Sequence, residues 1–103
     1  MLAFKDSVDK YFAGLKNVAA YSGKLHISEK RLGQATAKVL GKTPKQIIDD
    51  RVILEAKRLL VHGNQTVKEI GFQLGFEETT NFIKYFRKHT TKTPVEFRDS
   101  YLS

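Results

Sequence analysis

The sequence predicts an all-α fold of about seven helices, and three observations lead to this prediction. Apolar residues recur at the three- and four-residue spacing of amphipathic helices along nearly the whole chain. Glycine and proline stand where these patterns stop, as at Gly41 and Pro44. No segment of useful length alternates apolar and polar residues as a half-buried strand would.

The composition narrows the class of protein. A length of 103 residues suits one compact domain or two small lobes sharing a core, and 41% hydrophobic residues suffice for that core. No apolar run approaches the ~18 residues of a membrane span, and charges interrupt the apolar N-terminal stretch, so neither a span nor a signal peptide is expected. Cysteine is absent, which excludes disulfides and thiolate metal sites and fits a reducing interior.

The charge balance points to a polyanion. Eighteen Lys and Arg residues face eleven acidic ones, for a formal charge of +7 and a pI near 9.7. So basic a small domain is typical of proteins that bind nucleic acid.

Two stretches of the chain repeat one pattern. Residues matched at a constant offset are Val18, Tyr21, Ser22, Leu25 and Ile27 in the first copy and Val67, Ile70, Gly71, Leu74 and Phe76 in the second. The runs Lys42-Thr43-Pro44 and Lys92-Thr93-Pro94 match at an offset one residue longer. We therefore infer an internal duplication, with one extra residue in a turn of one copy.

The turns of the two copies are predicted from single residues. Gly71 lies where a second helix can approach closely, and Gly75 supplies the left-handed backbone that ends a helix. His26 holds the place of Gly75 in the first copy, and histidine tolerates positive φ. His26 is thus expected to be a turn residue, with Phe76 filling the turn of the second copy.

Helix starts are predicted from capping residues. Asn17 and Ser28 are expected to cap the second and third helices. Thr66, with Glu69 three residues later, predicts a capping box on the fifth. Glu77 and Glu78 precede the sixth helix, where capping and the helix dipole are their expected roles. Either carboxylate is alternatively suited to accept from cytosine N4.

The periodic residues predict which faces are buried. The expected inner positions are Phe4, Val8, Tyr11, Phe12 and Leu15 in the first helix, Leu32, Ala35, Thr36 and Val39 in the third, and Phe82, Tyr85, Phe86 and His89 in the sixth. A fourth helix from about 44 to 61 has two expected stripes, Ile48, Val52, Ala56, Leu59 and Leu60, and Ile47, Leu54 and Val61. A short helix opened by Pro94 is expected to bury Val95, Phe97 and Leu102.

The second half of the chain resembles a known protein family. The run Ile70-Gly71, Gly75-Phe76, Phe82, Phe86-Arg87-Lys88, Thr93-Pro94 and Phe97-Arg98 is similar to the C-terminal signature of AraC/XylS-type bacterial transcription regulators. The resemblance extends from about Asp9 onward. It implies a single DNA-binding domain, 1–103, with helix-turn-helix lobes at about 1–43 and 64–103 joined by a linker helix at about 44–61.

The resemblance also implies a function and a site. Recognition helices at about 29–40 and 78–89 are expected to enter adjacent major grooves of double-stranded DNA. The base-contact candidates carried over by position are Lys30, Arg31, Gly33, Gln34, Thr79, Thr80, Asn81 and Lys84; Gly33 has no side chain to read a base. The phosphate-contact candidates are Ser28, Lys38, Thr66, Arg87 and Lys88.

The sequence departs from the family at a few positions. The family often has a long polar residue at the position of Gly33, a large aromatic residue at Thr36 and glycine at Thr91. We therefore expect the first lobe to be the less stable and less discriminating of the two.

Partners follow from the same resemblance. Transcription regulation in the bacterial cytoplasm, at the nucleoid, is implied, with RNA polymerase as a further candidate partner and no membrane partner. Regulators of this kind usually carry a sensor domain, and nothing in these residues resembles one. We expect the chain to be a C-terminal domain of a longer regulator.

Other functions receive less support. His26, His62 and His89 are scattered without metal-ligand spacing, and no nucleophile elbow or phosphate loop is present, so no enzyme activity, cofactor or metal is expected. A basic RNA-binding module and a helical protein-interaction module remain as alternatives. The latter predicts an exposed apolar patch. Phe82, Tyr85 and Phe86 are expected to pack in the core rather than to stack on bases.

Overall fold

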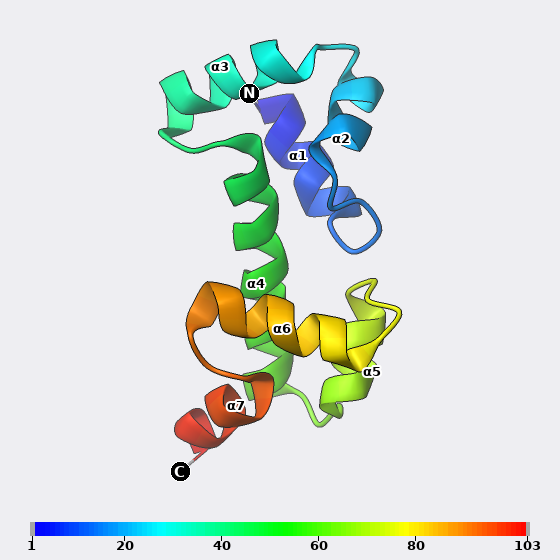
Figure 1. The fold of residues 1–103 in the computed structure, drawn as a ribbon, viewed down its shortest axis with the longest axis vertical. Helices are drawn as coiled ribbons and strands as arrows, with labels where there is room; N and C mark the ends of the chain where they lie inside the picture. Colours follow the sequence, from blue (N-terminus) through cyan, green and yellow to red (C-terminus); the bar gives the residue numbers. More distant parts are fainter. Residues whose placement is uncertain (1, 103) are drawn as a thin grey trace. The chain divides into compact units, whose positions relative to one another are not determined.

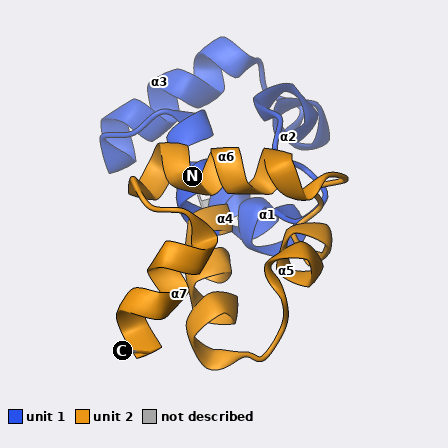
Figure 2. Cartoon of the chain, turned by 60° about the horizontal axis from the view of Figure 1, so that its bottom comes forward, with its two compact units in different colours: residues 1–51 blue, residues 52–103 orange. Residues whose placement is uncertain are grey.

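The computed structural model describes residues 2–102, and these form seven α-helices and no strand, which confirms the predicted fold class (Figure 1). The helices are α1 (Leu2–Tyr11), α2 (Val18–Leu25), α3 (Glu29–Leu40), α4 (Pro44–His62), α5 (Val67–Gln73), α6 (Thr79–Thr90) and α7 (Pro94–Leu102). The chain divides into two compact units, residues 1–51 and 52–103 (Figure 2). The boundary falls within α4, so each unit contains part of that helix.

Unit 1 is built around aromatic residues of α1 and α2. Phe4 and Tyr21 are both buried, and their rings meet edge to face with centroids 5.7 Å apart. The Tyr21 hydroxyl donates to the Leu15 carbonyl at 2.6 Å, and burial raises the pKa of this phenol to about 12. Leu32 and Thr36 supply the buried face of α3. These contacts pack α1 against α2 and α2 against α3.

Unit 2 is built around phenylalanines of α6 and α7. Phe82 and Phe86 are fully buried, and Phe86 meets Phe97 of α7 edge to face at 5.6 Å. As expected, Gly71 permits a close approach, because an added Cβ would lie 3.0 Å from the Phe82 ring. The guanidinium of Arg98 donates to the Leu60 carbonyl at 2.8 Å and the Gln65 carbonyl at 2.7 Å. Arg98 thereby anchors α7 to the end of α4 and the following loop.

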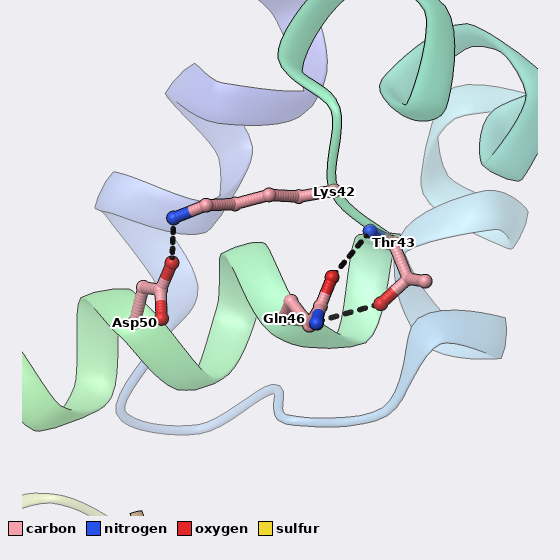
Figure 3. A network of polar contacts seen from close by, with 4 residues as sticks. All are labelled: Lys42, Thr43, Gln46 and Asp50. Carbon is pink, nitrogen blue, oxygen red and sulfur yellow. Dashed lines mark hydrogen bonds and ion pairs between the residues drawn. The ribbon is translucent and has the colours of Figure 1, made fainter.

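The capping geometry repeats between the copies. Thr43 and Gln46 exchange side-chain bonds with each other's backbone N–H at the start of α4, at 2.9 and 3.1 Å, beside the Lys42–Asp50 ion pair (Figure 3). Thr93 and Glu96 form the same box at the start of α7, at 2.8 and 3.2 Å. The duplication inferred from the sequence is therefore also visible in the hydrogen bonds.

The turns follow the prediction. His26 has φ 54° and Gly75 has φ 92°, so both adopt the left-handed conformation. The N-cap residues of the next helices are Ser28 and Glu78. Because Ile27 and Phe76 directly follow the left-handed residues, Glu77 is the extra residue of the second copy.

Several expected core positions are wrong. Val39 is 61% exposed, Val95 54% and Leu102 68%, since the pattern marks a helix face without showing whether a neighbour covers the terminal turns. In α4 the exposed residue is Leu54 and the buried one is its neighbour Ile53. α1 ends at Tyr11, so Phe12 and Leu15, which are only half-buried, lie in the turn that follows rather than in the helix.

Candidate nucleic-acid interface

The third helix presents its polar residues on one side. Ser28 caps it, accepting from the Arg31 N–H at 3.2 Å, and Leu32 and Thr36 face the core. The predicted contact residues on the other side are all exposed: Lys30, Arg31, Gln34 and Lys38. Gly33 is half-buried and lies on the flank of the helix, between the buried and the exposed sides.

The sixth helix follows the same plan in unit 2. Phe82 and Phe86 face the core, so the expectation that they pack rather than stack on bases is confirmed. Phe76 supports the helix from the preceding turn, with its ring 5.4 Å from Phe82 and 5.2 Å from Tyr85. The predicted contact residues are exposed, apart from the half-buried Thr79: Thr80, Asn81, Lys84, Arg87 and Lys88.

The cations of α3 and α6 form no salt bridge within the described residues. Ion pairs within the described residues include Lys42–Asp50, Lys45–Asp49, Arg51–Asp9 and Arg58–Glu55. None of them involves a cation of α3 or α6. Arg87 is within electrostatic range of Glu96 and contributes to lowering the pKa of that carboxyl, after the hydrogen bonds from Thr93. The exposed faces of α3 and α6 therefore each carry cations that would attract a polyanion.

The two helix-start candidates for phosphate differ. The predicted capping box of α5 is confirmed: Thr66 Oγ1 accepts from the Glu69 N–H at 3.1 Å, and Glu69 accepts from the Thr66 N–H at 2.9 Å. These bonds lower the pKa of the Glu69 carboxyl. A carboxylate thus already occupies the start of α5, which makes Thr66 the weakest of the phosphate candidates.

The start of α6 has no such cap. Glu78 holds the N-cap position, but its side chain makes no capping hydrogen bond, so the capping role expected for it is wrong. The glutamate side chain is longer than the serine, threonine, aspartate or asparagine that the N-cap position prefers. Glu78 and Glu77 are both exposed, beside the base-contact candidates of α6.

Sequence reasoning missed Phe72 of α5. Its side chain is 77% exposed and borders a surface depression of about 420 Å³. The depression is lined by Gln65, Lys68, Glu69, Phe72, Gln73, Phe76, Glu77 and Thr79. The sequence did contain a signal for this residue. Phe72 follows Lys68 by four residues, so helical periodicity places a phenylalanine on the polar side of α5.

Two further features are absent from the described part of the chain. No group of three or more His, Cys, Asp or Glu side chains is placed to hold a metal ion there. Nor does that part contain a helix that combines the length and apolar character of a membrane span.

Comparison with known proteins assigns the family. A family described as "Helix-turn-helix domain" matches residues 21–100. The uncharacterized HTH-type transcriptional regulator YobQ of Bacillus subtilis is 35% identical over 66 residues, covering 64% of this chain and 27% of YobQ. The chain spans between 21% and 33% of the length of the curated relatives it matches.

Solved structures share the fold. The C-terminal domain of the two-component response regulator yesN from Fusobacterium nucleatum superposes with a TM-score of 0.82 at 25% identity, covering 92% of this chain and 93% of that domain. The DNA-binding domain of AdpA, solved in complex with a target DNA, also gives 0.82 at 19% identity, covering 95% and 88%. With the match over residues 21–100, these findings show that the chain belongs to the AraC/XylS-type helix-turn-helix family of sequence-specific DNA-binding transcription regulators.

Proposed function

We propose that this chain binds a non-palindromic duplex DNA site, with α3 and α6 each entering its own stretch of major groove. One observation supports the proposal: two matched helices bury an apolar face, and their opposite face exposes cations that form no ion pair among the described residues. A helix of this kind fits the major groove of B-DNA, whereas A-form RNA hides its major groove.

The chemistry of the exposed side chains assigns their roles. Arg31 and Lys84 are suited to bond guanine O6 and N7, and Gln34 and Asn81 to pair with adenine. Lys30, Thr79 and Thr80 are additional base contacts. The remaining candidates lie towards helix ends and are assigned to phosphates: Ser28, Lys38, Thr66, Arg87 and Lys88.

The two lobes carry different residues at matching positions, and this sets the form of the site. Arg31 corresponds to Asn81, and Gln34 to Lys84. Each lobe therefore selects a different half-site, and a single chain needs no palindrome. Successive major grooves on one face of the duplex place the two halves about one turn, ~34 Å, apart.

The biological setting is part of the same proposal. DNA binding at promoters places the chain in the bacterial cytoplasm, at the nucleoid. RNA polymerase is the partner through which bound protein would alter transcription, and a sensor region outside these residues would control it.

A salt titration tests the binding mode. Affinity for a selected duplex, a scrambled duplex and a double-stranded RNA of the same length is measured by fluorescence anisotropy at increasing salt. We expect the selected duplex to bind at least ~10³-fold more tightly than the scrambled one at physiological salt. Equal affinity for both DNA duplexes, or preference for the RNA, would reduce the function to non-specific attraction.

A further inference from the structure

Gly33 is a glycine that the fold does not require. It lies inside α3, a helix of twelve residues, where glycine is less favourable than alanine because it gives the unfolded chain more freedom. An added Cβ would meet no atom of the described residues within 4 Å, outside its own stretch of helix backbone. Its φ is not positive either, since the glycines of positive φ are Gly41 and Gly75.

Some other glycines of the chain have structural reasons. An added Cβ at Gly71 would lie 3.0 to 3.1 Å from Phe82, and at Gly63 it would lie 3.0 Å from the Leu59 carbonyl. Gly41 ends α3 in the left-handed conformation. Gly14, Gly23 and Gly33 have neither reason, and of these three only Gly33 lies on a helix proposed to enter the major groove.

The surroundings of Gly33 point to DNA. Lys30, about one turn before Gly33, and Gln34, the next residue, are exposed and are proposed to contact bases. Ala37, one turn further along, is also exposed and short. At the corresponding positions α6 carries the larger side chains of Ile83 and Arg87.

We propose that Gly33 is a positioning residue that lets the backbone of α3 approach the edge of a base pair in the major groove, with Lys30 and Gln34 on either side. Glycine permits a backbone to come this close to a ligand where any side chain would hold it off. The inference rests on the proposed entry of α3 into the major groove. It implies that α3 enters the major groove more deeply than α6 does.

A matched pair of variants separates stability from binding. Gly23 is an exposed glycine inside α2, where an added Cβ also meets nothing within 4 Å among the described residues. We expect Gly33→Ala and Gly23→Ala each to raise Tm by about 4 °C, because both replace a helix-interior glycine without a clash. Only Gly33→Ala is expected to weaken binding to the selected duplex, by about tenfold. Gly33→Leu should weaken it further.

Each outcome of these measurements either supports or overturns the proposal for Gly33. A gain in Tm with loss of affinity in Gly33→Ala alone supports the proposal. It is overturned if Gly33→Ala binds the selected duplex as the wild type does, if it lowers Tm, or if Gly23→Ala loses as much affinity. A wild-type chain without preference for any duplex would overturn the proposed function as well, whereas a specific wild type with an unaffected Gly33→Ala would overturn this inference alone.

Discussion

The two units fill equivalent cores with aromatic residues in different places. In unit 1 the large ring comes from Tyr21 of α2, opposite the small Thr36 of α3. In unit 2 the matching position of α5 is Ile70, and the ring comes from Phe86 of α6. The buried rings thus come from different helices in the two units, so corresponding helices do not have to supply the same core residues.

The helix ends also keep one backbone geometry while the residue that adopts it differs. Gly41 ends α3 and Thr91 ends α6, and both have φ 67°. Glycine adopts this conformation without strain, whereas threonine, which is β-branched, does not. The backbone of the turn is therefore kept even where the residue is unfavourable.

The largest change in stability is expected when a ring is removed from the core of unit 2. Phe86→Ala should lower the free energy of unfolding by about 3–5 kcal/mol, because it removes a fully buried ring. Thr36→Ala, at the corresponding position, should cost only about 1 kcal/mol, the value of its hydrogen bond to the Gly33 carbonyl. Urea denaturation of both variants measures the difference. Equal losses would contradict the assignment of the cores.

The second effect separates the reading surfaces. Arg31→Ala and Lys84→Ala should each weaken binding to the selected duplex by about 1–3 kcal/mol and relax the preference of one half-site only. Lys38→Ala, a proposed phosphate contact, is the control and should weaken all duplexes alike. The comparison fails if both variants alter the same half-site. Selection from a random duplex library with each variant provides the measurement.

The third effect sharpens the contrast between helix ends. Thr91→Gly should stabilise the chain by about 1 kcal/mol, because it relieves a β-branched residue in the left-handed region. Gly41→Thr should destabilise by a similar amount. Thermal unfolding followed by circular dichroism measures both changes, and a destabilised Thr91→Gly would show that Thr91 contributes more than its strain costs.

The smallest effect concerns pH. Hydrogen bonds from Thr93 lower the pKa of the Glu96 carboxyl below its ordinary value of 4.5, so this carboxylate stabilises the folded chain above that pH. The contribution is lost as pH falls through the lowered pKa. Gln46, its counterpart in unit 1, does not titrate. Glu96→Gln should therefore lose less Tm than the wild type between pH 6 and pH 3, and superimposable pH profiles would contradict the prediction.

Much of the fold is predictable because it depends on local rules. The caps at Asn17, Ser28 and Thr66 and the left-handed turn at His26 each follow from the chemistry of one residue. The outward placement of the α3 and α6 cations follows from helical periodicity. The resemblance to a known family then supplied the function that these placements support.

What the sequence does not predict depends on neighbours. Val95 and Leu102 fit an inner stripe of α7 yet are exposed, because no described element covers that side. The choice of Ile53 over Leu54 depends on how α4 is rotated against its surroundings. The Glu78 side chain makes no capping hydrogen bond, and the Phe72 ring is exposed. Helical periodicity does not predict which side chains lack a neighbour.

Selection of the wild-type chain on a random duplex library tests the central claim most directly. We predict two dissimilar half-motifs in a fixed order, with centres about one helical turn, roughly 10.5 base pairs, apart. A palindrome, or a single short motif, would contradict the claim that two unequal lobes each read their own stretch of major groove.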